Sequence, residues 1–102
     1  MVWVDLSDAI PPELGKHRPG IVVSNSVQNA VLETVVVVPL SSRSPEIAYL
    51  RLRISPVGKI GGFAVIPGIR QIKKSRILDV AGHLALSDLQ RVGEAIDAYL
   101  SD

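Results

Sequence analysis

The sequence predicts a mainly β (α+β) fold, in which a small, strongly bent antiparallel β-sheet or β-barrel carries a C-terminal α-helix. Three observations lead to this fold class. Short β-branched runs alternate with clusters of turn residues along most of the chain. Apolar residues change to helical spacing after residue 87. Of the 102 residues, 47% are hydrophobic and only 4% are aromatic, so we expect one aliphatic core and one domain, residues 1–102.

The runs expected to form strands are 2–5, 19–24, 33–40, 48–54 and 63–66, with 69–72 resuming the last strand after a bend at Pro67-Gly68. Residues 33–40 are apolar at consecutive positions, which is typical of a strand that is buried on both faces. In residues 48–54, apolar side chains alternate with Tyr49, Arg51 and Arg53, so these three are expected on one exposed face.

The C-terminal helix is expected over about 88–100, where Leu89, Val92, Ile96 and Leu100 recur at helical spacing. Ser87 and Gln90 have the spacing of a capping box, which predicts where the helix begins. The expected connections are a loop over 7–17, a polar link with one helical turn over 25–30, a loop over 41–46 and a glycine-rich turn over 55–62.

Composition excludes several classes of protein. There are no cysteines and only two histidines, His17 and His83, which lie far apart, so we expect no metal site, disulfide or cofactor. No apolar run approaches the roughly 18 residues of a membrane helix, and the first residues lack the features of a signal peptide. We therefore expect a soluble cytoplasmic protein. The net charge of +1 means that any basic surface must come from local clustering.

The segment KHRP places Lys16, His17 and Arg18 directly before Pro19 and a β-branched run. Proline favours an extended conformation for the preceding residue, so the Arg18 guanidinium is expected at a defined strand entrance, where it can bind phosphate. The imidazole of His17 can move a proton, and Glu13 can orient Arg18 or accept a proton. The alternative is that all of these are solvated loop residues without a chemical role.

Two further groups carry hydrogen-bond donors. Ser41, Ser42 and Arg43 follow the apolar run at its end, where small hydroxyls suit a phosphate oxygen, although serine is also common in turns. The predicted face with Tyr49 and two arginines suits a nucleic-acid backbone, with the tyrosine stacking on a base, and it is equally compatible with a plain solvent face. A later basic cluster contains Arg70, Lys73, Lys74 and Arg76.

The series WVDL, RPGIVVSN, Asn29, VVVVPLSS and GIRQIKKSRI, followed by an amphipathic helix, resembles the MazF/PemK (Kid) toxin family. The resemblance implies an SH3-like barrel shared with CcdB toxins, a homodimer, and a cognate MazE/PemI-like antitoxin with an acidic C-terminal tail. It also implies sequence-specific, metal-independent cleavage of single-stranded RNA, causing growth arrest. In such cleavage the 2′-hydroxyl attacks phosphorus, leaving a 2′,3′-cyclic phosphate and a 5′-hydroxyl.

The resemblance also implies roles for individual residues. Arg18 matches the arginine that acts on the scissile phosphate, Ser41 matches a phosphate-binding Thr or Ser, and Glu13 matches an acidic loop residue. The chain departs from the family at Pro67-Gly68, where an acidic residue and a glutamine are usual, and at Pro12, where some members have histidine.

The resulting hypothesis is an endoribonuclease toxin, with candidate catalytic and RNA-contacting residues. The candidate catalytic residues are Arg18, Ser41, Glu13 and His17. The candidate RNA contacts are Lys16, Asn29, Ser42, Arg43, Tyr49, Arg51, Arg53 and Arg70. The alternative function is a non-nuclease binding protein of the same fold, either a CcdB-like gyrase inhibitor or an RNA-binding relative without turnover.

Overall fold

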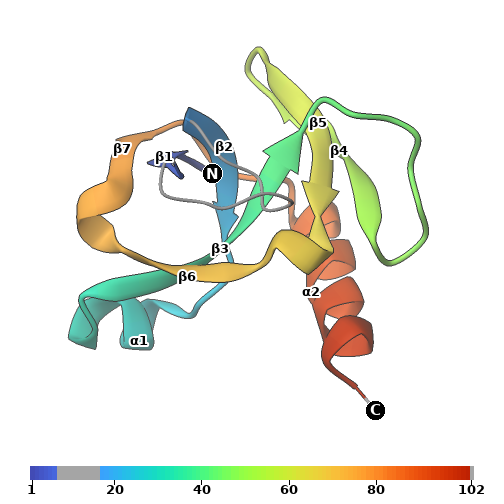
Figure 1. The fold of residues 1–102 in the computed structure, drawn as a ribbon. Helices are drawn as coiled ribbons and strands as arrows, with labels where there is room; N and C mark the ends of the chain where they lie inside the picture. Colours follow the sequence, from blue (N-terminus) through green and yellow to red (C-terminus); the bar gives the residue numbers. More distant parts are fainter. Residues whose placement is uncertain (7–16, 102) are drawn as a thin grey trace.

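The computed structural model describes residues 1–6 and 17–101. In chain order the elements are β1 (Val2–Asp5), β2 (His17–Val22), α1 (Ser26–Val31), β3 (Thr34–Ser41), β4 (Arg51–Val57), β5 (Ile60–Val65), the 3-10 helix η1 (Ile66–Gly68), β6 (Arg70–Lys73), the 3-10 helix η2 (Lys74–Arg76), β7 (Ile77–Val80) and α2 (Leu86–Leu100). Figure 1 shows β1, β2 and β7 above β3 and β6 running below it, with the β4–β5 hairpin and α2 on the right.

One antiparallel sheet contains all seven strands, in the order β4-β5-β3-β2-β1-β7, with β6 paired separately to β3. The N-terminal half of β3, Thr34 to Val37, pairs with β6, whereas Leu40 and Ser41 pair with β5. Because β3 exchanges one neighbour for another along its length, the sheet bends around it. In the described part of the chain no ladder joins β6 to β7, so the sheet bends towards a barrel without closing.

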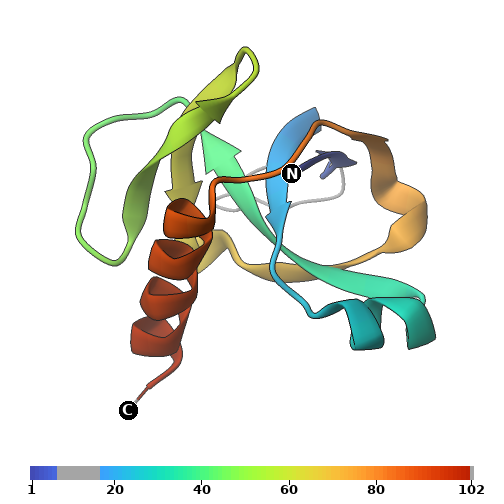
Figure 2. The same ribbon diagram turned by 180° about the vertical axis from the view of Figure 1, so that it is seen from behind.

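The bent sheet separates two apolar cores. The first lies inside the bend and contains Val2, Val4, Leu6, Val35, Val37 and Ile72. The second lies between β2, β3, the hairpin and α2, and contains Ile21, Val38, Leu40, Leu52, Ile54, Ala64, Ile66, Val92 and Ala95. Figure 2 shows α2 on the hairpin side of the sheet, where it covers this second core.

The mainly β fold with a C-terminal helix is confirmed, and so is the two-sided burial of the strand predicted over 33–40. Successive β3 side chains point to opposite faces. Val37 therefore enters the first core and Val38 the second, and both are fully buried. The helical turn expected over 25–30 is α1, whose first turn is capped by the Asn25 side chain accepting from the Gln28 N–H at 2.9 Å.

The strand predicted over 48–54 is wrong in its first half. β4 begins at Arg51, and Tyr49 lies in the preceding turn with a φ of 63°. The glycine-rich turn predicted over 55–62 is also wrong, because β4 and β5 occupy most of it and form a hairpin that turns at Gly58 and Lys59. Pro56 has no N–H to donate to a neighbouring strand. It is compatible with β4 because β4 is an edge strand.

The predicted helix is confirmed, but its capping box is wrong. The residue that precedes the first turn is Ala85, which makes no side-chain cap, so Ser87 lies within α2. The buried side chain of Asp88 instead accepts a hydrogen bond from the Ser55 N–H in β4, at 2.8 Å. The sequence interpretation also missed β7, because its four residues follow the basic segment KKSR. None of the helices in the described residues is long and apolar enough to cross a membrane.

The second core generates a prediction about stability. Ile66 is fully buried where η1 meets α2 and the hairpin. Ile66→Ala is expected to lower the free energy of unfolding by about 3 kcal/mol, because it removes apolar contacts and leaves a cavity. Chemical denaturation measures this loss. The matched control is Leu78→Ala on β7, at a side chain that is 51% exposed, and it is expected to cost less than about 1 kcal/mol. Equal losses for the two variants would contradict the assignment of the core.

Candidate functional site

The register between β2 and β3 brings two of the predicted site residues together. Gly20 pairs with Pro39, and Ile21 pairs with Val38. Continuing this antiparallel register by two residues from the first pair puts Arg18 opposite Ser41, and directly opposed residues face the same side of a sheet. Both line a pocket of about 310 Å³, together with His17, Pro19, Leu40, Ser42 and Gly61.

Arg18 is half-buried at the rim of this pocket. Its Nη1 donates to the backbone carbonyl of Leu40 at 3.3 Å, which ties the guanidinium to the end of β3. Pro19, next in β2, restricts the Arg18 backbone to an extended conformation, as the strand requires. The strand that carries Arg18 is paired on both sides, so its side chain leaves the sheet in a defined direction. A guanidinium needs such a fixed direction to bind phosphate through two parallel hydrogen bonds.

Ser41 ends β3 and is half-buried. Its Oγ accepts a hydrogen bond from the Arg43 N–H at 3.1 Å, which turns the chain away from the sheet. The Ser41 hydroxyl accepts in this bond, so its own hydrogen remains available for donation to an oxygen in the pocket. The predicted hydroxyl at the strand end thus adjoins the predicted guanidinium.

A row of opposed residues extends this site across the hairpin. Ser41 is opposite Phe63 of β5, and Phe63 is opposite Arg53 of β4. Opposed residues share a face, so Arg18, Ser41, Phe63 and Arg53 form one cross-strand row. With neighbouring strands about 4.8 Å apart, Arg53 lies on the order of 10 Å from Ser41 along the row. Two cations, about 14 Å apart along the row, thus flank a hydroxyl and an aromatic ring.

His17 has a partner that the sequence did not reveal. It is opposite Asp5 of β1, and its Nε2 lies 3.7 Å from Asp5 Oδ1. The His17 side chain is exposed and lines the same pocket as Arg18. An adjacent carboxylate orients an imidazole. The WVDL segment was a visible motif, but only the β1–β2 register shows which residue its aspartate contacts.

The segment after Ser41 carries the exposed residues Ser42, Arg43 and Tyr49. Tyr49 is 59% exposed, and its positive φ is uncommon for a residue with a side chain. Arg51 is half-buried, and its Nη1 donates to Pro45 O at 3.4 Å, back towards this segment. The candidates Glu13 and Lys16 lie outside the described residues.

Asn29 and Arg70 are not among the residues that line this pocket. The Asn29 side chain is bonded to Ser24 in both directions, with Oδ1 accepting from the Ser24 hydroxyl at 2.5 Å and Nδ2 donating to the Ser24 carbonyl at 3.1 Å. It thus ties α1 to the far end of β2 from Arg18. Arg70 in β6 is opposite Val37 and so faces the inside of the bend.

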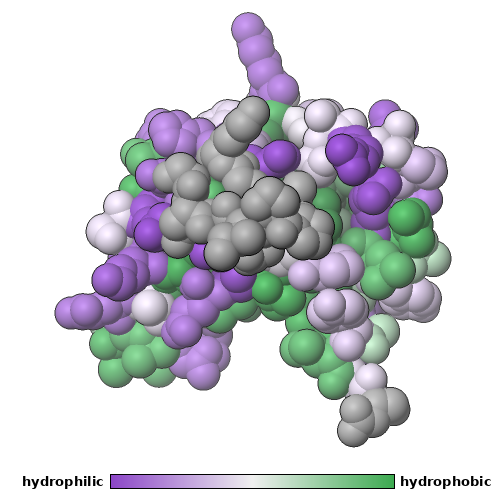
Figure 3. All heavy atoms as spheres, in the orientation of Figure 1, coloured by the Kyte–Doolittle hydropathy of each residue, from purple (hydrophilic) through white to green (hydrophobic). Residues whose placement is uncertain are grey.

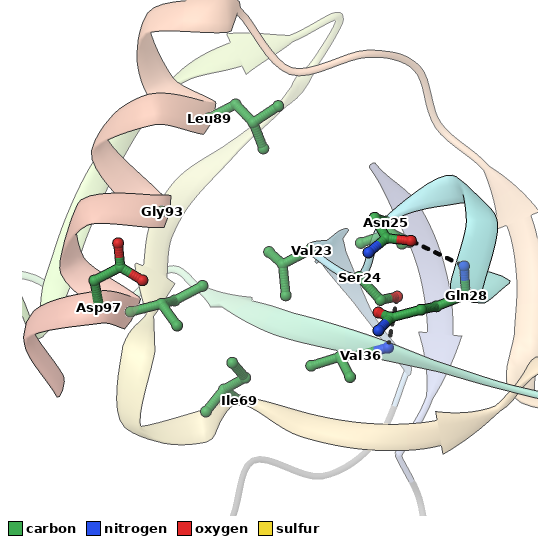
Figure 4. A pocket seen from close by; sticks show the side chains of 11 residues that line it. Val23, Ser24, Asn25, Gln28, Val36, Ile69, Leu89, Gly93 and Asp97 are labelled. Carbon is green, nitrogen blue, oxygen red and sulfur yellow. Dashed lines mark hydrogen bonds between the residues drawn. The ribbon is translucent and has the colours of Figure 1, made fainter. Parts of the chain in front are cut away.

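A second cavity of about 570 Å³ lies between α2 and the sheet. Figure 4 shows Leu89, Gly93 and Asp97 of α2 on one side and Asn25 and Gln28 on the other. Its remaining lining is largely aliphatic, and none of the candidate site residues belongs to it. Figure 3 shows a hydrophobic patch over α1, where Val27 and Val31 are more than 70% exposed. Of the candidate residues, His17, Arg18, Ser41 and Ser42 line the pocket of about 310 Å³.

Comparison with known proteins identifies the family. Residues 1–100 match the family of PemK-like, MazF-like toxins of type II toxin–antitoxin systems. The chain belongs to this toxin family. The identification from the sequence motifs is thereby confirmed. Pro67 and Gly68, the two residues at which the resemblance led us to expect an acidic residue and a glutamine, lie in η1, where a Cβ on Gly68 would lie 2.9 Å from Pro39 Cγ.

Solved structures share the toxin's fold. The toxin is similar to MazF (Form-I) from Deinococcus radiodurans, with a TM-score of 0.87 and 20% identity, over 97% of this chain and 90% of that chain. It is similar to an endoribonuclease in complex with its cognate antitoxin from a mycobacterial species, with a TM-score of 0.81 and 20% identity, over 97% and 88% of the two chains. For Mycobacterium tuberculosis toxin MazF-mt6 the TM-score is 0.76 at 19% identity, over 100% and 99%.

The strand end that carries Ser41 generates a second prediction. Gly62 has a φ of 136°, and a Cβ there would lie 2.6 Å from the Ser41 carbonyl oxygen. Gly62→Ala is expected to displace this strand end and to cost about 3 kcal/mol of stability, because strained backbone adds to the clash. NMR shifts of the Ser41 and Arg43 amides, with chemical denaturation, measure both effects. Gly58→Ala is the matched control, since no atom lies within 4 Å of a Cβ there. Unmoved Ser41 and Arg43 shifts in Gly62→Ala would contradict the close contact.

Proposed function

We propose that this toxin is a sequence-specific, metal-independent endoribonuclease that cleaves single-stranded RNA and so arrests growth. The observation that carries the proposal is the pairing of Arg18 with Ser41 at one pocket, in a chain that belongs to the PemK-like, MazF-like family. The solved relative described as an endoribonuclease supports the same reaction class. Arg18 and Ser41 bind the scissile phosphate, and the remaining residues handle protons or hold the RNA.

The phosphate is stabilised by charge and hydrogen bonds. As the 2′-hydroxyl oxygen attacks phosphorus, negative charge grows on the non-bridging oxygens. The Arg18 guanidinium stays protonated throughout and donates two parallel hydrogen bonds to those oxygens. The Ser41 hydroxyl donates a further one. Donors that are already oriented before reaction favour the transition state most, and removal of one such donor typically costs about 10²–10³ in rate.

Two protons must move during the reaction. A base takes the proton of the 2′-hydroxyl as the bond from O2′ to phosphorus forms. An acid gives a proton to O5′ as its bond to phosphorus breaks, so the products are a 2′,3′-cyclic phosphate and a 5′-hydroxyl. His17, held by Asp5, provides one of these groups, and Glu13 of the preceding loop provides the other. Neither transfer needs a metal ion.

The RNA strand follows the cross-strand row away from the scissile phosphate. Arg53 binds a phosphate further along the strand, and Arg43, Arg51 and Ser42 donate to the backbone or to base edges. Tyr49 offers an exposed ring on which a base stacks. Lys16, outside the described residues, remains a candidate RNA contact. Asn29 and Arg70 remain candidate RNA contacts at the periphery, on a second copy of the chain in a homodimer.

The same cations bind the antitoxin. A cognate MazE/PemI-like antitoxin with an acidic, disordered C-terminal tail is complementary to a row that contains Arg18 and Arg53, and it folds over the pocket as it binds. A solved relative in complex with its cognate antitoxin supports such a partner. Antitoxin binding therefore blocks RNA access, and the toxin acts in the cytoplasm when the antitoxin is lost.

The Arg18 assignment is tested by substitution. Arg18→Ala is expected to reduce cleavage of a long mixed-sequence RNA at least about 10³-fold in EDTA, because the phosphate loses its main charged donor. Mapping of 5′-hydroxyl ends measures cleavage, and circular dichroism checks the fold. Lys59→Ala at the hairpin tip is the matched control and is expected to retain activity. Wild-type-like cleavage by Arg18→Ala would sink this site. Gyrase-dependent DNA breaks instead of RNA cuts would support the CcdB-like alternative, and RNA binding without cuts would support a non-nuclease relative.

The role of His17 is tested separately. His17→Ala is expected to lower kcat about 10²-fold and to leave KM within about threefold, because it removes proton transfer rather than a phosphate contact. Single-turnover cleavage and RNA-binding measurements separate these two quantities. Asp5→Asn is expected to lower kcat less, since the imidazole remains. Unchanged kcat in His17→Ala assigns the proton transfers to other groups.

A further inference from the structure

The outer edge of β4 has an unusual set of hydrogen-bond partners. Within the described residues β4 pairs with β5 alone, so its other edge faces away from the sheet. Arg51 exchanges backbone hydrogen bonds with Ile47 there, at 2.8 and 2.9 Å. Further along, the N–H of Arg53 donates to Glu46 Oε2 at 2.7 Å, and the N–H of Ser55 donates to Asp88 Oδ2 at 2.8 Å. Side chains therefore take the place that a neighbouring strand would occupy.

Arg91 of α2 joins these partners into one network. Its Nη1 donates to the Arg53 carbonyl at 2.9 Å and lies 3.3 Å from Asp88 Oδ1. Its Nη2 donates to Glu46 Oε2 at 3.1 Å. The guanidinium thus contacts the helix, the edge of β4 and the segment 42–50. Asp88 is buried, whereas the Arg91 and Glu46 side chains are each nearly half exposed.

The network holds the segment that carries three of the proposed RNA contacts. Ser42 and Arg43 precede Glu46, and Tyr49 follows it by three residues. All three are exposed, so nothing in the core holds them in place. Tyr49 adopts its uncommon positive φ between the Ile47 bonds and the start of β4. Backbone strain of this kind persists only where the surroundings impose it.

We propose that Arg91, acting through Glu46, is a positioning residue that holds segment 42–50 and thereby determines which RNA sequences the toxin cuts. This inference rests on the proposed function. Arg91 lies on the helix and belongs to no set of candidate RNA contacts, so its effect passes through the segment. Preorganised contacts bind more tightly and select more strongly than mobile ones, because less ordering entropy is lost on binding.

Loss of the network is expected to loosen the segment rather than to unfold the chain. The Arg91–Glu46 pair is nearly half exposed on both sides, and such ion pairs contribute little to global stability. Arg91 also contacts the buried Asp88, so Arg91→Met is expected to lower global stability as well, whereas Glu46→Gln leaves that pair intact. Local opening of a surface segment, in contrast, depends on just such hydrogen bonds. The hydrogen bond from the Ser55 N–H to Asp88 does not involve Arg91. We therefore expect β4 and α2 to stay in contact when Arg91 is replaced.

The test compares Arg91→Met, Arg91→Lys and the control Lys59→Met in the full chain. In Arg91→Met, amide exchange at Ile47 and Arg51 is expected to accelerate about tenfold. KM for RNA is expected to rise about tenfold, while kcat stays within about twofold. The variant is also expected to discriminate less strongly among the mapped cut sites. Arg91→Lys keeps one contact and gives intermediate values. Lys59→Met behaves as wild type.

A second pair of variants separates positioning from folding. Glu46→Gln removes the charge that Arg91 contacts, and Glu94→Gln on the outer side of α2 is its control. The same rise in KM is expected for Glu46→Gln alone. Unchanged amide exchange, or an unchanged KM and cut-site pattern, in both Arg91→Met and Glu46→Gln overturns the inference. A fall in kcat that parallels a loss of thermal stability across the variants also overturns the inference. A wild-type chain that cuts no RNA refutes the proposed function instead, and the amide exchange then still decides whether Arg91 holds the segment.

Discussion

The rest of this toxin depends on one constraint: β3 is buried on both faces and paired along both edges. Its side chains enter two cores, with Val37 inside the bend and Val38 under α2. One of its edges pairs with β2, and the other changes from β6 to β5 along the strand. Because β3 is buried on both faces and paired on both edges, a shift of its register by one residue would move every buried side chain to the opposite face. The position of each neighbouring strand, and therefore of each site residue, follows from this one register.

The candidate site lies where β3 leaves the core. The same register that buries the valines presents Ser41 at the strand end with Arg18 opposite it, so the sheet holds the two residues that are proposed to bind phosphate. The segment 42–50 has no such support from a core. Its position depends on hydrogen bonds to the β4 edge and to Arg91. The proposed reaction centre is thus held by the sheet, whereas the order of the proposed recognition segment depends on a few polar contacts.

The sequence interpretation was correct for elements that a local pattern of residues specifies. It was wrong for elements whose boundaries depend on contacts with other segments of the chain. The consecutive apolar residues of 33–40 predicted a doubly buried strand correctly, and helical spacing predicted α2. Alternation in 48–54 was misleading, because the Ile47–Arg51 pairing turns the chain at Tyr49 and delays β4. The capping box was misleading because Asp88, at its second position, bonds to β4 instead. Glycines at 58, 61 and 62 resembled a loop, although a paired hairpin accommodates them.

Motif order and apolar periodicity, read along the chain, were enough for the fold class, the toxin family and the choice of Arg18 and Ser41. These features are local, and residues a few positions apart specify them. Tertiary structure alone decided that Arg18 is opposite Ser41, that Asp5 accompanies His17, and that Arg91 reaches across to Glu46. Each of these pairs joins segments whose contact depends on strand register and helix packing. The physical reason is that register results from burying both faces of β3 at once, a condition that no single stretch of sequence contains.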